Sequence, residues 1–299
     1  MIDVWSSAGV RLPRSIPSPG NAPLPMDEIT FLQLRSGDRS EINLGYNSEY
    51  SLLAQMIKLN AILAEINAIN EAAAATPTYE PRDYRSVDIV SQKLDNWLHS
   101  IPDEMQDTPT NLSRYAARGL GNIFVAVYLG YYNYGQMLYY QFLHADRNDR
   151  SDLVHAYANK CKAHAIGLCE ILYRSYAMPG CEALYTMVGH VLVIASTIQL
   201  HILLFDTDEL QIRTARMRLE RNFEILTKLQ SYWPALDLCF SRLREFHKAC
   251  QNSTETSFRM DQWMLRFLLE FAKPVGEKES DVVPDLGPWT MQSLGFSPL

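Results

Sequence analysis

The sequence predicts an all-α protein, an irregular multi-helix bundle of about eight helices that follows a proline-rich N-terminal segment. Three observations lead to this prediction. From Ser48 onward, apolar residues recur every three or four positions, the spacing that places them on one stripe of a helix. No segment shows the apolar and polar alternation of a strand, and no repeat of fixed period indicates a solenoid. The chain has 299 residues, of which 47% are hydrophobic, so it can bury a substantial core.

The N-terminal part, residues 11–30, is expected to be irregular because five prolines fix φ there and remove backbone donors. The first helix is expected over residues 48–70. Its apolar stripe consists of Leu52, Met56, Leu59, Leu63 and Ile66. After a linker at 72–82, a second stripe starts at Val87 and ends at Ile101, because a proline follows.

Six further helices are expected on the same grounds. Their ranges are 112–144, 151–178 with Ser151 as the N-cap, 182–205, 206–233, 234–250 and 257–272. The helix over 206–233 is expected to open with a capping box, because Asp206 stands three residues before Glu209. We expect one helical domain over residues 1–276. The acidic and apolar tail, 277–299, is expected to be flexible or to dock, either on this domain or on a partner.

Charge and cysteine content exclude some classes of protein. The net charge of −7 and the isoelectric point near 5.5 argue against direct DNA binding, which needs a clustered positive field. The five cysteines are odd in number and scattered, and the first thirty residues lack the apolar core of a secretory signal. The sequence therefore predicts a reducing, intracellular compartment.

Residues 188–205 are apolar enough to resemble a membrane span. His190, Gln199 and His201 argue against a span, because uncompensated polar groups are costly in hydrocarbon. We expect a central buried helix here and no membrane partner. The two histidines stand about three helical turns apart and so share a face.

Signatures of catalysis and of metal binding are lacking. The chain has no G-x-S-x-G, no H-E-x-x-H and no phosphate-binding lysine loop. Its nearest match to an aspartate motif for magnesium and diphosphate is Asp206-Thr-Asp208-Glu209, which helix capping explains. The histidines of 188–205, with His155, Cys161 or His164, do not make a recognised ligand spacing. We predict no catalytic residue, no metal and no cofactor.

The segment YLGYYNYGQMLYYQF, residues 128–142, holds more tyrosines than one core stripe needs. Gly130 and Gly135, unfavourable inside a helix, suggest that a ligand or another backbone approaches closely. Two interpretations stay open, a dense aromatic core and an apolar pocket for a small hydrophobic metabolite. The residues predicted to make polar contacts in such a pocket are Tyr131, Tyr134, His190 and His201. Tyr134→Ala is predicted to weaken ligand binding more than folding.

An ordered set of short motifs extends over about 250 residues. The motifs are D-x-x-x-S-x-G (Asp3, Ser7, Gly9), then Arg11, Pro13 and Arg14, L-P-x-D-E-x-x-F (Leu24, Pro25, Asp27, Glu28, Phe31), W-x-x-x-[LI]-P (Trp97, Ile101, Pro102), the tyrosine-rich segment, C-x-x-x-A-I (Cys161, Ala165, Ile166) and Trp233. In this order the chain resembles the later part of the regulatory middle homology region of fungal binuclear zinc cluster transcription factors. It departs from them at Gln141-Phe142, where relatives often carry Arg-Pro.

The resemblance implies an all-α domain that controls an appended DNA-binding zinc cluster in the nucleus, often in response to a metabolite. The cluster and the first part of the region are not in this sequence, so we expect no direct DNA binding. Three functions stay open. The main prediction is a nuclear regulatory module that senses a small hydrophobic metabolite or a protein partner. The alternatives are an enzyme or carrier of secondary metabolism acting on a hydrophobic substrate, with cytoplasmic localisation as the second choice, and a purely structural interaction protein.

Overall fold

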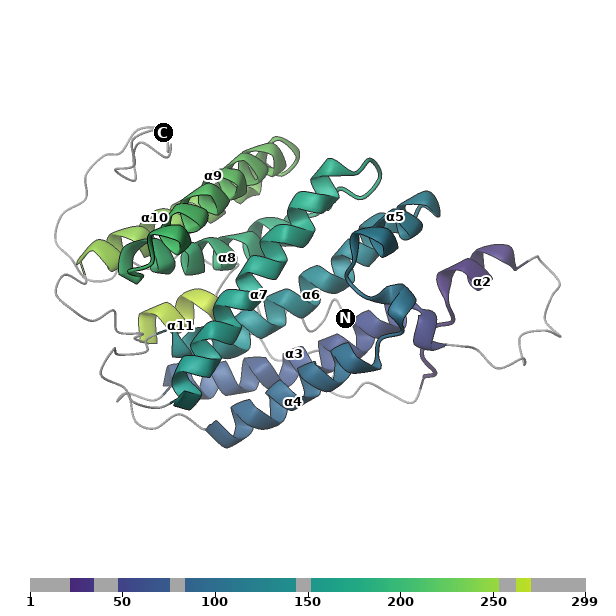
Figure 1. Ribbon diagram of the computed structural model, residues 1–299, viewed down its shortest axis with the longest axis horizontal. Helices are drawn as coiled ribbons and strands as arrows, with labels where there is room; N and C mark the ends of the chain where they lie inside the picture. Colours follow the sequence, from purple (N-terminus) through teal and green to yellow (C-terminus); the bar gives the residue numbers. More distant parts are fainter. Residues whose placement is uncertain (1–21, 35–47, 76–83, 144–151, 253–261, 270–299) are drawn as a thin grey trace.

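The computed structural model describes residues 22–34, 48–75, 84–143, 152–252 and 262–269, and they confirm the all-α fold (Figure 1). This part of the chain contains ten α-helices, four short 3-10 helices and no strand. The α-helices are α2 (Glu28–Gln33), α3 (Leu52–Ala75), α4 (Tyr84–Ser100), α5 (Pro109–Ala117), α6 (Gly121–Tyr139), α7 (Asp152–Ala177), α8 (Thr186–Phe205), α9 (Glu209–Tyr232), α10 (Asp237–Asn252) and α11 (Gln262–Leu269). The 3-10 helices are η1 (Ser48–Tyr50), η2 (Asp103–Met105), η3 (Tyr140–Phe142) and η4 (Pro234–Leu236).

Helix α6 is central to the bundle. It packs most extensively on α7 and also contacts α3, α4, α5 and α8. Beyond α7, helix α8 packs on α9 and α10, while α11 packs on α3. Figure 1 shows α3 and α4 along one flank and α9 and α10 along the other, with α6, α7 and α8 between them. Buried apolar side chains from α3 through α11 form one continuous core.

The helix expected over 112–144 is two helices, because α5 ends where a new turn begins. Gly119 has φ of +72°, a left-handed conformation that glycine adopts without strain. Its N–H donates to the carbonyl of Ala116 at 2.9 Å, and the N–H of Leu120 donates to the carbonyl of Tyr115 at 2.9 Å. These two bonds make a Schellman motif, which ends α5 and sends α6 in a new direction.

The capping box expected at Asp206 is wrong. The N-cap of α9 is Asp208, whose carboxylate accepts from the N–H groups of Leu210 and Gln211. The carboxylate of Asp206 instead accepts from the N–H groups of Thr207 and Asp208, and it pairs with Lys162 of α7 at 3.1 Å. Asp206 therefore shapes the turn between α8 and α9 and ties that turn to α7.

Other boundaries differ by a few residues. Helix α8 begins at Thr186 and not at residue 182, after a turn in which Gly180 has φ of +78°. Helix α2 was not expected, since it follows the prolines of the irregular segment. Most of that segment, the N-cap Ser151, both expected ends of the last helix and the tail 277–299 lie outside the described residues.

Two described helices, α3 and α8, have the length and apolar character of a membrane span. For α8, 89% of the apolar 18-residue stretch is buried inside the protein. Two of its polar residues have partners there, since Thr197 shares a hydrogen bond of 2.8 Å with the hydroxyl of Tyr140, and Ser196 accepts from Asn222 of α9 at 3.0 Å. The apolar character of α8 is therefore that of a core helix.

Candidate functional site

The two predicted tyrosines lie on α6 and face different neighbours. Tyr134 is 1% exposed, and its hydroxyl donates to Asn60 Oδ1 of α3 at 3.2 Å. Tyr131 stacks on Trp97 of α4 with ring centroids 5.2 Å apart, and it contacts the ring of His164 on α7 at 5.1 Å. Tyr134 therefore belongs to the contact between α3 and α6, and Tyr131 to the contact among α4, α6 and α7.

The two predicted histidines are buried on α8. Burial, with the positive charge of Arg242 on α10, lowers the pKa of His190 well below its usual range. The ring of His201 packs on that of Phe205, with centroids 5.2 Å apart. The two tyrosines on α6 and the two histidines on α8 thus pack in the core, and a ligand site shared by all four stays a prediction.

The other tyrosines of the α6 region have hydrogen-bond partners in the core. The hydroxyl of Tyr128 donates to the carbonyl of Met105, that of Tyr139 to Ser91 Oγ and that of Tyr132 to Asp107, at 2.6 to 2.8 Å. These bonds join α6 to η2, to α4 and to the bend between η2 and α5. These hydroxyls therefore stabilise the bundle and set the position of η2.

His164 is enclosed by aromatic rings. Its imidazole contacts the rings of Tyr131, Tyr132 and Tyr139 at centroid distances of 5.1 to 6.1 Å. Burial lowers the pKa of His164 to about 4; Asp95 on α4 opposes this shift and Lys160 on α7 adds to it. The imidazole is consequently neutral at physiological pH and serves as a packing group.

This lowered pKa predicts acid sensitivity. Because the folded pKa lies below the unfolded value near 6.5, the unfolded state binds the proton more tightly. Stability should therefore fall as the pH drops from about 6.5 to about 4, by at most about 3 kcal/mol from this residue. Urea unfolding measured at several pH values tests this, with His164→Phe as the comparison. If the free energy of unfolding fell equally with pH in the wild type and in His164→Phe, the lowered pKa of His164 would be contradicted. The other buried histidines are present in both proteins and affect both alike.

The buried cysteines are poor nucleophiles. All five are buried thiols outside any disulfide. Burial raises the pKa of Cys169 and of Cys239 to about 11 each, and raises that of Cys161 further. Among the described side chains, no group of three or more histidines, cysteines, aspartates and glutamates could hold a metal ion. Nucleophilic catalysis by these thiols is therefore disfavoured, since the thiolate is the reactive form.

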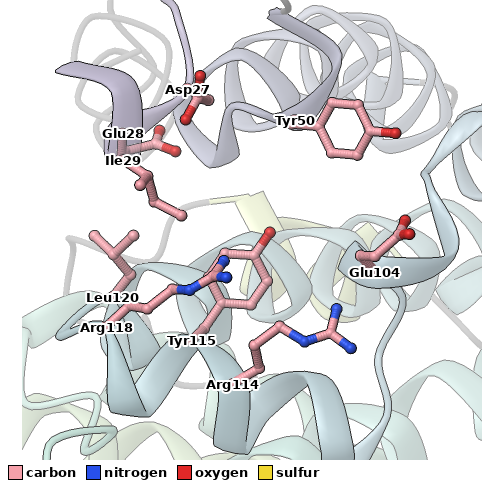
Figure 2. Close-up of a pocket in the computed structure, with 9 residues that line it drawn as sticks. All are labelled: Asp27, Glu28, Ile29, Tyr50, Glu104, Arg114, Tyr115, Arg118 and Leu120. Atoms are coloured by element: carbon pink, nitrogen blue, oxygen red, sulfur yellow. The ribbon is translucent and has the colours of Figure 1, made fainter. Parts of the chain in front are cut away.

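A cleft of about 560 Å³ lies between α2 and α5 (Figure 2). This volume is in the range of small-molecule sites, about 300 to 1,000 Å³. The cleft is lined by Asp27, Glu28, Ile29, Tyr50, Glu104, Arg114, Tyr115, Arg118 and Leu120. Figure 2 shows the side chains from α2 and η1 facing those from η2 and α5 across it. This cleft is a candidate for a binding site.

Helix α5 places its cleft residues by well-defined ends. Thr108 is the N-cap and accepts from the N–H of Asn111 at 3.1 Å, Pro109 stands in the first turn, and the motif at Gly119 closes the helix. Arg114 and Arg118 are four residues apart and so lie on the same side of α5. Tyr115 stacks on Phe124 of α6 at 5.0 Å, and Figure 2 shows its hydroxyl directed into the cleft.

Helix α2 is held across the cleft mainly by one carboxylate. Glu28 accepts from the hydroxyl of Ser51 and from the N–H groups of Leu52 and Leu53, at 2.9 to 3.1 Å. It thereby caps the N-terminus of α3 from a different helix. No residue of α2 itself is buried, so this capping interaction and the packing of Ile29 on the core attach the helix.

We expect Glu28→Ala to loosen α2 and to lower the free energy of unfolding by about 1 kcal/mol, within the range of lost helix caps. Hydrogen exchange of the α2 amides should become faster, while exchange in α6 should not change. Glu49→Ala is the control, because Glu49 is an exposed carboxylate in η1 close to the same helix end. Equal exchange of α2 in the two variants would contradict the capping role.

Sequence patterns did not reveal the cleft, because its residues come from four short segments that no motif links. The one local signal was the spacing of Arg114, Tyr115 and Arg118 on a short helix. Comparison of the chain with family models, with curated proteins and with solved structures gave no match in any of the three.

Proposed function

We propose that the protein is a ligand-sensing regulatory module for transcription that acts in the nucleus, with the cleft between α2 and α5 as its sensory site. The observation that carries this proposal is the cleft itself, which combines an apolar wall, Ile29 and Leu120, with polar side chains that have room for a ligand. The resemblance to the middle homology region of fungal zinc cluster regulators supports the regulatory part.

The attachment of α2 supplies a physical route from binding to regulation. A molecule in the cleft would contact α2 on one side and α5 on the other, because the lining residues come from both. Helix α2 also presents Phe31 and Leu32 to solvent, 63% and 69% exposed. Ligand binding would therefore stabilise α2 and fix the surface it offers to a protein partner, as a population shift between a loose and a docked helix.

Binding in the cleft is tested by a fragment screen on the full chain, with thermal unfolding and hydrogen exchange as measurements. We expect at least one compound to raise the melting temperature and to slow exchange in α2 and α5. Ile29→Trp should fill the cleft and abolish this effect. Leu32→Trp should not, because Leu32 lies on the same helix but outside the cleft lining. Equal binding by both variants would exclude the cleft as the site.

The regulatory part is tested separately, with the full chain fused to a heterologous DNA-binding domain in a reporter cell. The proposal predicts a reporter signal that changes with a cleft-binding compound in the wild type and in Leu32→Trp, but not in Ile29→Trp. Binding without any change of the reporter would retain the ligand site and reject transcriptional regulation.

A further inference from the structure

The charges around the cleft are unevenly compensated. Of its three carboxylates, Asp27 accepts from the N–H of Thr30 as the N-cap of α2, and Glu28 accepts three hydrogen bonds at the start of α3. Both stand at helix N-termini, where the helix dipole stabilises negative charge. The carboxylate of Glu104 on η2 has no such partner in the described part of the chain.

Two arginines stand at the C-terminal end of α5, Arg114 in its last turn and Arg118 as its C-cap. Neither Arg114 nor Arg118 forms an ion pair or a side-chain hydrogen bond within the residues that the structure describes. Two other arginines of the bundle are engaged, since Arg174 pairs with Asp107 at 2.8 Å and Arg218 with Glu170 at 3.7 Å. The cleft therefore holds two guanidinium groups with no ion-pair partner among the described residues, beside three carboxylates of which two are bound at helix N-termini.

A third donor accompanies the arginines. Burial and the charge of Glu28 raise the pKa of Tyr115, with Arg118 and Arg114 acting in the opposite direction, so the phenol is protonated and able to donate. Its hydroxyl points into the cleft, and both arginines extend from the same helix (Figure 2). Leu120 lies beside Arg118, and Ile29 faces it from α2, so that these two side chains form an apolar wall at one end of the cleft (Figure 2).

We infer that the cleft binds a small organic acid, with its anionic group on Arg114, Arg118 and the Tyr115 hydroxyl and its apolar body against Ile29 and Leu120. This inference rests on the proposed ligand-sensing function and names the class of its ligand. Guanidinium groups form charge-assisted hydrogen bonds with carboxylates, which are stronger than neutral ones. Two guanidinium groups and one phenol can bind a single carboxylate, and the negative charges of Asp27, Glu28 and Glu104 disfavour ligands with more than one anionic group.

The test uses decanoate and 1-decanol as probes of the full chain, because they share an apolar chain and differ in the head group. Calorimetry should show decanoate binding about tenfold or more tighter than 1-decanol, the ratio expected for about 1.4 kcal/mol. The affinity for decanoate should also fall as salt is raised, since exposed charges are screened.

Variants assign the head-group contacts. Arg118→Gln, at an exposed position, and the double change Arg114→Gln with Arg118→Gln should weaken decanoate about tenfold or more and leave 1-decanol unaffected. Arg213→Gln on the exposed face of α9 is the control and should bind decanoate like the wild type. Circular dichroism of each variant verifies folding, and the single variant suffices if the double one is unstable.

The outcomes separate the two proposals. Equal affinity for the acid and the alcohol, or unchanged decanoate binding in Arg118→Gln, would overturn the acid class while leaving the ligand-sensing cleft in place. Binding of neutral fragments only, blocked by Ile29→Trp, would do the same. Failure of decanoate, 1-decanol and the whole fragment screen to bind would overturn the proposed function together with the inference.

Discussion

Gly135→Ala should lower the free energy of unfolding by about 1–3 kcal/mol, the usual cost of overpacking a core. A Cβ at this position of α6 would overlap the imidazole of His164 on α7. That ring has no free space to move into, because Tyr131 and Tyr139 pack around it. Helices α6 and α7, the pair that packs most extensively in the described part of the chain, would have to separate, and the contacts between them would weaken.

Gly130→Ala is the matched control in the same helix. There the nearest atoms to an added Cβ belong to Tyr134 at 3.8 Å, which is an ordinary contact. Alanine favours the helix by about 0.5–1 kcal/mol over glycine, so this variant should be slightly more stable than the wild type. Urea unfolding of both variants gives the comparison, and a Gly135→Ala protein as stable as Gly130→Ala would refute the close approach of α6 and α7.

Tyr134→Ala should cost about 3–5 kcal/mol of unfolding free energy, as for other large aromatic side chains removed from a core. The side chain is 1% exposed and links α6 to α3 through Asn60. The sequence predicted that Tyr134→Ala weakens ligand binding more than folding. With so large a loss of stability, however, the variant would unfold, and an unfolded protein binds no ligand. Tyr134→Ala therefore cannot separate binding from folding.

Tyr134→Phe separates the two. It keeps the ring and removes the hydroxyl that donates to Asn60, so its cost should be about 1 kcal/mol. Equilibrium unfolding of the alanine and phenylalanine variants provides the measurement. A loss of stability in Tyr134→Ala no larger than in Tyr134→Phe would mean that the ring faces a cavity and not the packed core.

The glycines show how much of the packing the sequence contained. Gly130 and Gly135 were both interpreted as positions of close approach, and only Gly135 meets a crowding side chain. Periodicity places a residue on a helix face, but it does not say which partner stands opposite. The distance between α6 and α7 follows from the rings of both helices together, and this information is spread over residues far apart in the chain.

The cleft illustrates the same limit for function. Its arginines lie on a helix whose start and end can be recognised from Thr108, Pro109 and Gly119. The opposite wall depends on α2, a six-residue helix in a segment whose prolines indicate irregular structure. Glu28 holds this helix through the backbone N–H groups of α3, an interaction between residues about 24 positions apart that no local pattern encodes.

The sequence by itself determined the fold class and most of the long helices, because a stripe of apolar residues and the local chemistry of helix ends act within one segment. It also determined that α8 is a core helix, through polar residues that require partners inside a protein. Only the tertiary structure decided which tyrosine side chains pack in the core and where α2 attaches. It also decided that Arg114 and Arg118 have no ion-pair partner among the described residues. Those properties depend on the distances between segments, and a charge or a hydroxyl becomes a candidate for binding only when folding brings no internal partner to it.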